Sequence, residues 1–535
     1  MTAFSGTPHI DGPVRRLVVV LGDQLNHDSM LLEDLEPDRD AVLMMEVRSE
    51  SMEGPSHRMR TAFFLSAMRH FAIELEQGGH RVRYVALDDP ANTHSFSGEV
   101  ARAIDDLRPD SIAVVRPGDW RVYLEALSWH ERDGVPCEIV EDRHFLNTPE
   151  QFRAWADGRK SLTMEYFYRE QRKRLGVLMD GNSPEGGRWN YDSDNREIFR
   201  TTPETPPIEV TIPDAITTEV ITLVDRCLPG LPGRMSVDSF IWPVTRDDAR
   251  TGLRDFIEHR LPLFGKYEDA MWSGKHVLYH SLLSPALNVH LLDPRECVEA
   301  ALAAYKRGDA PLNSVEGFVR QLIGWREFIR GVYWLEGPGY RDRNWMGQTG
   351  SLPDFYWSGE TDMTCVRECL TPVLDHAWSH HIPRLMVLSN LALISGVSPR
   401  AIGDWFYGMY TDSVDWVTTP NTIGMAMHAD GERDETGRTV RLPVVGTKPY
   451  AASGKYISRM SNYCRDCVFD VNERAGEHAC PFNTFYWDFL IRHRETFRGN
   501  NRMAMILKNV DRLDPAVRSA ISTRARTLRT EWGIA

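Results

Sequence analysis

The segment Leu17-Val18-Val19-Val20-Leu21 decides the fold of the N-terminal part of the chain. A continuous run of apolar, mostly β-branched residues is typical of a strand that is buried on both faces of a parallel sheet. A helical pattern at 59–77 ends at Gly78-Gly79. Four later runs resemble the first, at residues 41–47, 82–87, 111–115 and 137–140. The alternation predicts a Rossmann-like α/β domain with a parallel sheet over residues 1–150.

The loop after the first predicted strand reads Gly22-Asp23-Gln24-Leu25. It is not a G-x-G-x-x-G motif, so a conventional dinucleotide fingerprint is absent. The carboxyl ends of the strands nevertheless remain the expected ligand-binding edge of the sheet.

The rest of the chain divides into two further parts. Residues 151–250 contain two stretches rich in turn formers, at 181–194 and 201–213, and we expect a long connector there. From about residue 251 the strand pattern disappears and helical periodicity replaces it, with frequent Trp and Tyr. We therefore expect an all-helical domain over residues 251–535.

Composition excludes several classes of protein. A chain of 535 residues is too long for one core, and no apolar run is long enough to span a membrane. Residues 1–13 lack the pattern of a secretory signal, and eight cysteines are too few for a disulfide scaffold, so we expect a cytoplasmic protein. The net charge of −14 argues against indiscriminate binding of nucleic acid but permits a local basic groove.

Three cysteines near the C-terminus form the sharpest local motif. Cys464-Arg465-Asp466-Cys467 is followed by Cys480-Pro481, and a Cys-x-x-Cys turn can bind one metal centre with two thiolates. Cys365 and Cys369, spaced i, i+4, are the candidates for a fourth ligand. Four thiolates suit either a structural zinc ion or a [4Fe–4S] cluster, and a proline after the last cysteine favours the cluster.

Two other motifs are ambiguous when taken alone. Ser281, Ser284 and Asn288 lie at a predicted helix start, where they could bind a phosphate or ribityl chain or simply cap the helix. His380-His381 lies in a helical run, and such a pair more often has one buried and one exposed member than a catalytic role.

Taken together, the motifs resemble a known family. The segment 281–288, the Ile-Gly-Trp-Arg-Glu-Phe helix at 323–328 and the Trp-Val-Thr-Thr-Pro-Asn loop at 416–421 look like the FAD domain of the photolyase/cryptochrome superfamily. The cysteine set, with Lys448-Pro449-Tyr450 before it, resembles the branch of iron–sulfur bacterial cryptochromes and (6-4) photolyases. The resemblance runs from residues 21–25 to 481–483 and includes 161–170 and 187–190.

The resemblance implies three cofactors. The helical domain would bind a folded FAD, with Ser281, Leu282, Ser284 and Asn288 around its phosphates and ribityl chain and Trp325, Arg326, Asp412 and Asn421 near the flavin. A [4Fe–4S] cluster would have Cys365, Cys464, Cys467 and Cys480 as ligands, which prefers Cys365 over Cys369. The α/β domain would bind a 6,7-dimethyl-8-ribityllumazine antenna beside Gly22, Asp23, Gln24 and Glu50.

The resemblance also implies a reaction. We expect light-dependent repair of (6-4) pyrimidine photoproducts by electron transfer from photoexcited reduced FAD to a flipped lesion in UV-damaged DNA, with proton donation by histidine. His380 and His381 would lie beside the lesion, Tyr450 and Tyr456 in its pocket, and Asp269 near the DNA backbone, where Mg²⁺ could bridge it to phosphate. Trp405 and Trp357 fit an electron route to the flavin. We expect a monomer.

Other functions remain as alternatives. The main one is a cryptochrome-like blue-light photoreceptor that signals through a partner; repair of cyclobutane dimers is the nearest other enzymatic activity. A structural nucleic-acid module would follow if the cysteines held zinc and no flavin bound. The chain departs from its relatives by an insertion at 431–441, by Phe406 where a tyrosine also occurs, and by Thr418 where a carboxylate can occur.

Overall fold

A computed structural model of the chain describes residues 10, 12–159 and 161–534. Most of the segment on which the expectation of no secretory signal rests, residues 1–9, lies outside the described residues. Within the described part, no helix is both long and apolar enough to cross a membrane.

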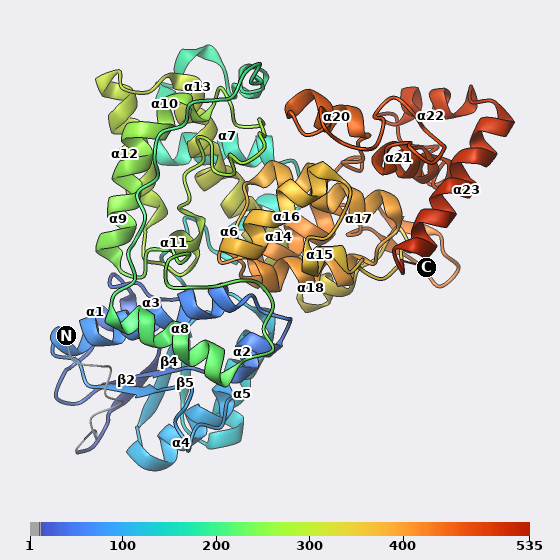
Figure 1. Cartoon of the computed structure of the whole chain (residues 1–535). Helices are drawn as coiled ribbons and strands as arrows, with labels where there is room; N and C mark the ends of the chain where they lie inside the picture. Colours follow the sequence, from blue (N-terminus) through green and yellow to red (C-terminus); the bar gives the residue numbers. More distant parts are fainter. Residues whose placement is uncertain (1–9, 11, 160, 535) are drawn as a thin grey trace.

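The N-terminal domain is built on a five-stranded sheet, which confirms the α/β prediction (Figure 1). Every pair of neighbouring strands is parallel, in the order β3-β2-β1-β4-β5. The strands are β1 (Arg16–Val19), β2 (Ala41–Met45), β3 (Val82–Val85), β4 (Ser111–Val115) and β5 (Cys137–Val140). The central strand β1 derives from the apolar run that predicted it.

The two faces of the sheet have separate cores. Leu17 and Val19 point into one core with α4 (Phe96–Leu107) and α5 (Trp120–Asp133), while Val18 points into the other with α3 (Arg58–Gln77). This alternation follows from the two-residue period of a strand. The core on the α3 side continues without interruption into the helical domain.

Two short helices lie near the carboxyl edge of the sheet. They are α1 (Met30–Glu33) and α2 (Arg48–Met52), and the second carries Glu50.

The segment predicted as a connector contains helices of its own. α6 (Pro149–Ala156) packs on α14 (Glu327–Glu336), and α7 (Met164–Leu175) also packs against the helical domain. After the short pair β6 (Met179–Asp180) and β7 (Ser183–Pro184), α8 (Ala215–Cys227) returns to pack along α3 (Figure 1). The segment therefore contacts both domains.

The C-terminal domain is helical, as expected. Its further α-helices are α9 (Arg246–Asp255), α10 (Leu261–Phe264), α11 (Ser284–Asn288), α12 (Pro294–Arg307), α13 (Leu312–Val319), α15 (Phe355–Ser358), α16 (Thr364–His376), α17 (Asn390–Ser395), α18 (Pro399–Met409), α19 (Asp415–Thr419), α20 (Gly454–Met460), α21 (Pro481–Arg492), α22 (Ala504–Asp511) and α23 (Pro515–Glu531). Among the described residues of this domain, the exception is a hairpin of β8 (Glu432–Arg433) and β9 (Thr439–Arg441) inside the 431–441 insertion. Arg433 donates to the carbonyl of Trp345 and Arg441 pairs with Glu336, so the hairpin is held against the end of α14.

Besides the π-helical segment η3 (Phe256–Arg260), the described part of this domain contains three longer ones: η4 (Arg320–Arg326), η6 (Pro383–Ser389) and η7 (Pro420–Ala426). A π-helical turn is uncommon and occurs frequently at functional sites. The segments η4, η6 and η7 contribute side chains to one cavity, described next.

Candidate functional site

The helical domain contains a cavity of about 470 Å³, here called the central cavity. This volume lies within the usual range for small-molecule sites, about 300–1,000 Å³. Every residue that the resemblance assigned to FAD lines it: Ser281, Leu282, Ser284, Asn288, Trp325, Arg326, Asp412 and Asn421. Residues separated by up to 140 positions therefore meet in one place, although the structure does not test their roles individually.

Asp412 organises one wall of the central cavity. Its carboxylate accepts hydrogen bonds from Ser284 Oγ at 2.7 Å and from both terminal nitrogens of Arg384 at 2.9 Å. Its backbone carbonyl accepts a bond of 2.7 Å from Asn288 Nδ2. Because charge-assisted bonds are stronger than neutral ones, this network fixes α11 to the segment that begins at Asp412.

Arg326 supplies unused hydrogen-bonding capacity. It is buried, its guanidinium lies over the rings of Phe145 and Trp416, and burial lowers its pKa to about 10. Its Nε and Nη2 have no partner among the described residues. A buried donor without an acceptor is costly, so an acceptor-rich ligand such as a phosphate, or a flavin carbonyl, fits this wall.

The pair His380-His381 also lines the central cavity. A third histidine, His280, lines it as well, although no motif in the sequence indicates it. His380 is buried and stacks on His280, with ring centroids 4.1 Å apart, while His381 is half exposed. Burial lowers the pKa of both His280 and His380 well below the usual value, so both are neutral near pH 7. His381 Nε2 lies 3.7 Å from Asp269 Oδ1.

Asp269 and the two tyrosines lie at or near the cavity rim. Tyr450 lines the cavity and is 39% exposed. Tyr456 and Asp269 do not line it, but Asp269 lies beside His381 and contributes to the raised pKa of Tyr456, about 12, which is caused mainly by burial. Arg196 approaches Asp269 to 3.9 Å. A partly exposed group of aromatic, acidic and basic side chains thus surrounds the histidines.

The aromatic residues next to the cavity are only partly those expected. Phe406 lines the cavity and packs on Trp405 with centroids 5.0 Å apart, and Trp405 packs on Tyr356 at 5.3 Å. Among the described ring contacts, none joins Trp405 to Trp357. Thr418 lines the cavity as well. The structure therefore supports Trp405 more directly than Trp357 as a neighbour of the cavity.

Four cysteines surround a second, small cavity, the cysteine cavity. Cys365 from α16 meets Cys464, Cys467 and Cys480, whereas Cys369 is buried elsewhere and does not line it. A Cβ atom on Gly454 would lie 2.8 Å from Cys480 Sγ, so only glycine leaves this thiol its room. Convergence of four thiols fits a four-thiolate centre, and the donor set alone suits zinc and iron–sulfur equally.

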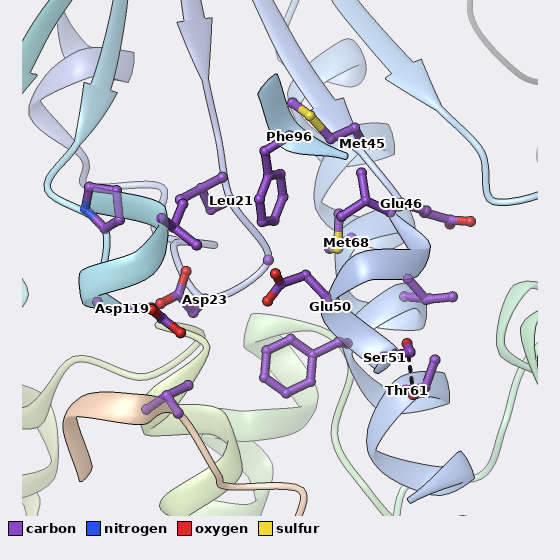
Figure 2. Close-up of a pocket in the computed structure, with 18 of the residues that line it drawn as sticks. Leu21, Asp23, Met45, Glu46, Glu50, Ser51, Thr61, Met68, Phe96 and Asp119 are labelled. Atoms are coloured by element: carbon purple, nitrogen blue, oxygen red, sulfur yellow. Dashed lines mark hydrogen bonds between the residues drawn. The ribbon is translucent and has the colours of Figure 1, made fainter. Parts of the chain in front are cut away.

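A third cavity, of about 90 Å³, lies at the carboxyl edge of the sheet and is here called the sheet-edge pocket (Figure 2). Gly22, Asp23 and Glu50 line it as expected. Gln24 does not: its amide donates to the carbonyls of Val115 and Arg116 at the end of β4, which turns it away.

The sheet-edge pocket contains functional groups that sequence reasoning missed. Asp119 from the α/β domain and Asp415 and Tyr407 from the helical domain also line it, and Figure 2 shows Asp23, Glu50 and Asp119 directed into it. Burial, reinforced by neighbouring carboxylates, raises the pKa of both Asp23 and Asp119 to about 7. Near neutral pH these groups can donate as well as accept hydrogen bonds, which fits a polar heterocyclic or polyol ligand.

Similarity to known proteins covers nearly the whole chain. It is 46% identical over 510 residues to a (6-4) photolyase of Agrobacterium fabrum, covering 95% of this chain and 98% of that protein. The family model described as deoxyribodipyrimidine photo-lyase-related protein matches residues 18–242.

Two solved structures are similar in fold. One is a bacterial class III photolyase from Agrobacterium tumefaciens, with a TM-score of 0.56, 16% identity and coverage of 85% of this chain and 88% of that chain. The other is a cryptochrome of Synechocystis, with a TM-score of 0.52, 15% identity and coverage of 80% and 84%. At these identities the likeness concerns the fold alone.

Proposed function

This chain belongs to the photolyase/cryptochrome superfamily, as its 46% identity with a (6-4) photolyase over 95% of its length shows, and we propose that it repairs (6-4) pyrimidine photoproducts in DNA with light. The observation that carries the proposal is the set of residues that line the central cavity. The residues matched to FAD and the pair His380-His381 line one continuous space, with Tyr450 partly exposed at its rim.

We assign three groups to this chain. FAD, when bound in the central cavity, supplies light-driven transfer of one electron; Arg326, Asn288 and Ser284 would hold it. We assign a [4Fe–4S] cluster to the cysteine cavity, and a ribityllumazine antenna to the sheet-edge pocket, where Asp23 and Glu50 would bind its polar groups.

The chain's own residues bind the lesion and move the proton. A dinucleotide inside a duplex cannot reach a buried cavity, so it must be flipped out at a cost of a few kcal/mol, less for distorted DNA. Tyr450 and Tyr456 can stack on the flipped bases, which contributes about 1–3 kcal/mol per base. Asp269 would hold a Mg²⁺ ion near the DNA backbone, because carboxylate oxygens are ligands that Mg²⁺ prefers.

We propose different roles for the two histidines. His380 is buried and neutral because of its lowered pKa, whereas His381 is half exposed beside Asp269. We assign proton donation to His381 and positioning to His380, which is held by its stacking on His280.

We further propose that the protein acts as a monomer in the cytoplasm. All eight cysteines are free of disulfides, which supports a reducing compartment.

The proposal is tested with an oligonucleotide that contains one defined (6-4) lesion, illuminated with blue light in the presence of reductant and Mg²⁺. We expect recovery of intact DNA by chromatography, loss of this activity in His381→Ala, and retention in His130→Ala, an exposed histidine on α5. Flavin-loaded protein that repairs neither this lesion nor a cyclobutane dimer would refute the enzyme and leave the photoreceptor as the better function.

A further inference from the structure

The central cavity and the sheet-edge pocket share one wall. The segment 412–418 contributes Asp412, Ser413 and Trp416 to the central cavity. The same segment contributes Val414 and Asp415 to the sheet-edge pocket. Neighbouring residues of a single segment therefore face two different binding sites.

Arg60 connects the sheet-edge pocket to this wall. It lies on α3 of the α/β domain, is 6% exposed and lines the pocket. Its Nη2 and Nε donate to the backbone carbonyl of Ser413 at 3.0 and 3.4 Å. Its guanidinium also lies over the rings of Phe64 and Tyr407 and donates to Ser56 Oγ, so its position is fixed on several sides.

On the other side of the wall, Asp412 and Ser413 are hydrogen-bonded to residues that line the central cavity. Ser413 Oγ donates to the carbonyl of Phe406, which lines that cavity. Asp412, the preceding residue, bonds Ser284, Asn288 and Arg384. A ligand that contacted Asp412 in the central cavity would therefore touch a residue whose neighbour, Ser413, accepts the hydrogen bonds of Arg60.

A second contact crosses the domains at the same wall. A Cβ atom on Gly118 would lie 2.9 Å from Asp23 Oδ2 and 3.0 Å from Trp416 Cδ1. The backbone of the sheet-edge pocket is thus in close contact with an aromatic wall of the central cavity, without space for adjustment.

We propose that Arg60 is a positioning residue that couples the two sites, so that a ligand in the sheet-edge pocket tightens the binding of FAD in the central cavity. The reverse effect must be equal, since coupling between two binding equilibria is reciprocal. The inference rests on the proposed cofactors but concerns a property that neither site has alone.

The test is equilibrium dialysis of the FAD-loaded protein with and without saturating 6,7-dimethyl-8-ribityllumazine. Retained FAD is quantified by chromatography, and bound lumazine by fluorescence polarisation. We expect lumazine to lower the FAD dissociation constant about fivefold or more, the lower end of typical allosteric couplings. Each variant is compared with its own lumazine-free state, so a general loss of stability cancels from the ratio.

Two substitutions assign the effect to Arg60. Arg60→Met removes the donors to Ser413. The ratio of the FAD dissociation constants without and with lumazine should therefore fall at least halfway towards one. Arg60→Lys, which keeps a donor, should have a ratio between those of Arg60→Met and the wild type. The matched control is Arg58→Met: Arg58 lies on the same helix but bonds Asp225 and the carbonyl of Leu231.

The outcomes separate the proposals. Equal FAD affinity in protein that visibly binds lumazine would overturn the coupling alone. A wild-type ratio in folded Arg60→Met would overturn the role of Arg60. Failure of lumazine to bind at all would overturn the antenna assignment, and the coupling with it, while leaving the repair activity untouched.

Discussion

A single methyl group at Gly454 should disrupt the cysteine cavity. Gly454 is the first residue of α20, and its backbone conformation does not itself require glycine. The added Cβ of Gly454→Ala would lie 2.8 Å from Cys480 Sγ and 3.2 Å from Val471 Cγ2. Neither neighbour can yield easily, because the Val471 carbonyl accepts a hydrogen bond from Asn483 and the Cys480 amide donates one to the Asp470 carbonyl.

The magnitude follows from two opposing effects. Overpacking a filled core costs about 1–3 kcal/mol. Replacing glycine by alanine in a helix stabilises it by at most about 1 kcal/mol. The two effects together leave a net loss of stability of up to about 2–3 kcal/mol. If the overpacking acts entirely on the metal-bound state, it lowers the equilibrium for metal retention by about 5- to 150-fold.

The assay is iron per protein after exposure to a chelator, measured together with the thermal unfolding midpoint. The matched control is Gly252→Ala in α9, where an added Cβ would meet no atom within 4 Å, so that the same exchange should stabilise. If Gly454→Ala keeps its iron and unfolds at a higher temperature, as the control should, then the close approach to Cys480 does not constrain the site.

Three other predictions concern the remaining sites. Cys464→Ala should lose iron and thermal stability together, because metal-binding energy is folding energy, whereas Cys369→Ala should keep its iron; equal iron in both variants would contradict the four-cysteine assignment. Asp23→Asn should raise the unfolding midpoint at pH 8 more than at pH 4: the folded-state pKa near 7 lies above the unfolded value of 3.8, so the wild-type protein loses stability as pH rises between them. The pKa difference limits this effect to about 4 kcal/mol, and water in the pocket reduces it; a pH-independent difference in midpoint would refute it. Arg326→Met should weaken FAD retention at least tenfold in dialysis, because it removes the unpartnered buried donors; unchanged retention would exclude Arg326 from the FAD site.

The sequence predicted the sheet well because its strands are short, continuous and apolar. The run at 17–21 predicted a strand buried on both faces, and its residues 17–19 lie in β1, the central strand of the sheet. The FAD set and the four cysteines were predicted by resemblance and converge on separate cavities.

What the sequence could not show are contacts between distant segments. His280 precedes a recognised motif, but nothing near it signals that it stacks on His380, 100 residues later in the numbering. Arg60 and Asp119 have no local pattern either, because their environment is created only when the two domains meet. Gln24 was assigned by its place in the loop, and its side chain instead satisfies the end of a strand.

The return of α8 to α3 has a practical consequence for dividing the protein. A fragment that ended at residue 150 would leave the apolar face of α3 without the helix that covers it, including the contacts of Val220, Ile221 and Val224. Such a fragment would expose this apolar surface to water and would aggregate on expression. A fragment that ended near residue 242, where the family match also ends, would include α8, which covers this apolar face of α3. The unit that folds around the sheet therefore includes α8, although the alternating strand and helix pattern of the sequence ends near residue 150.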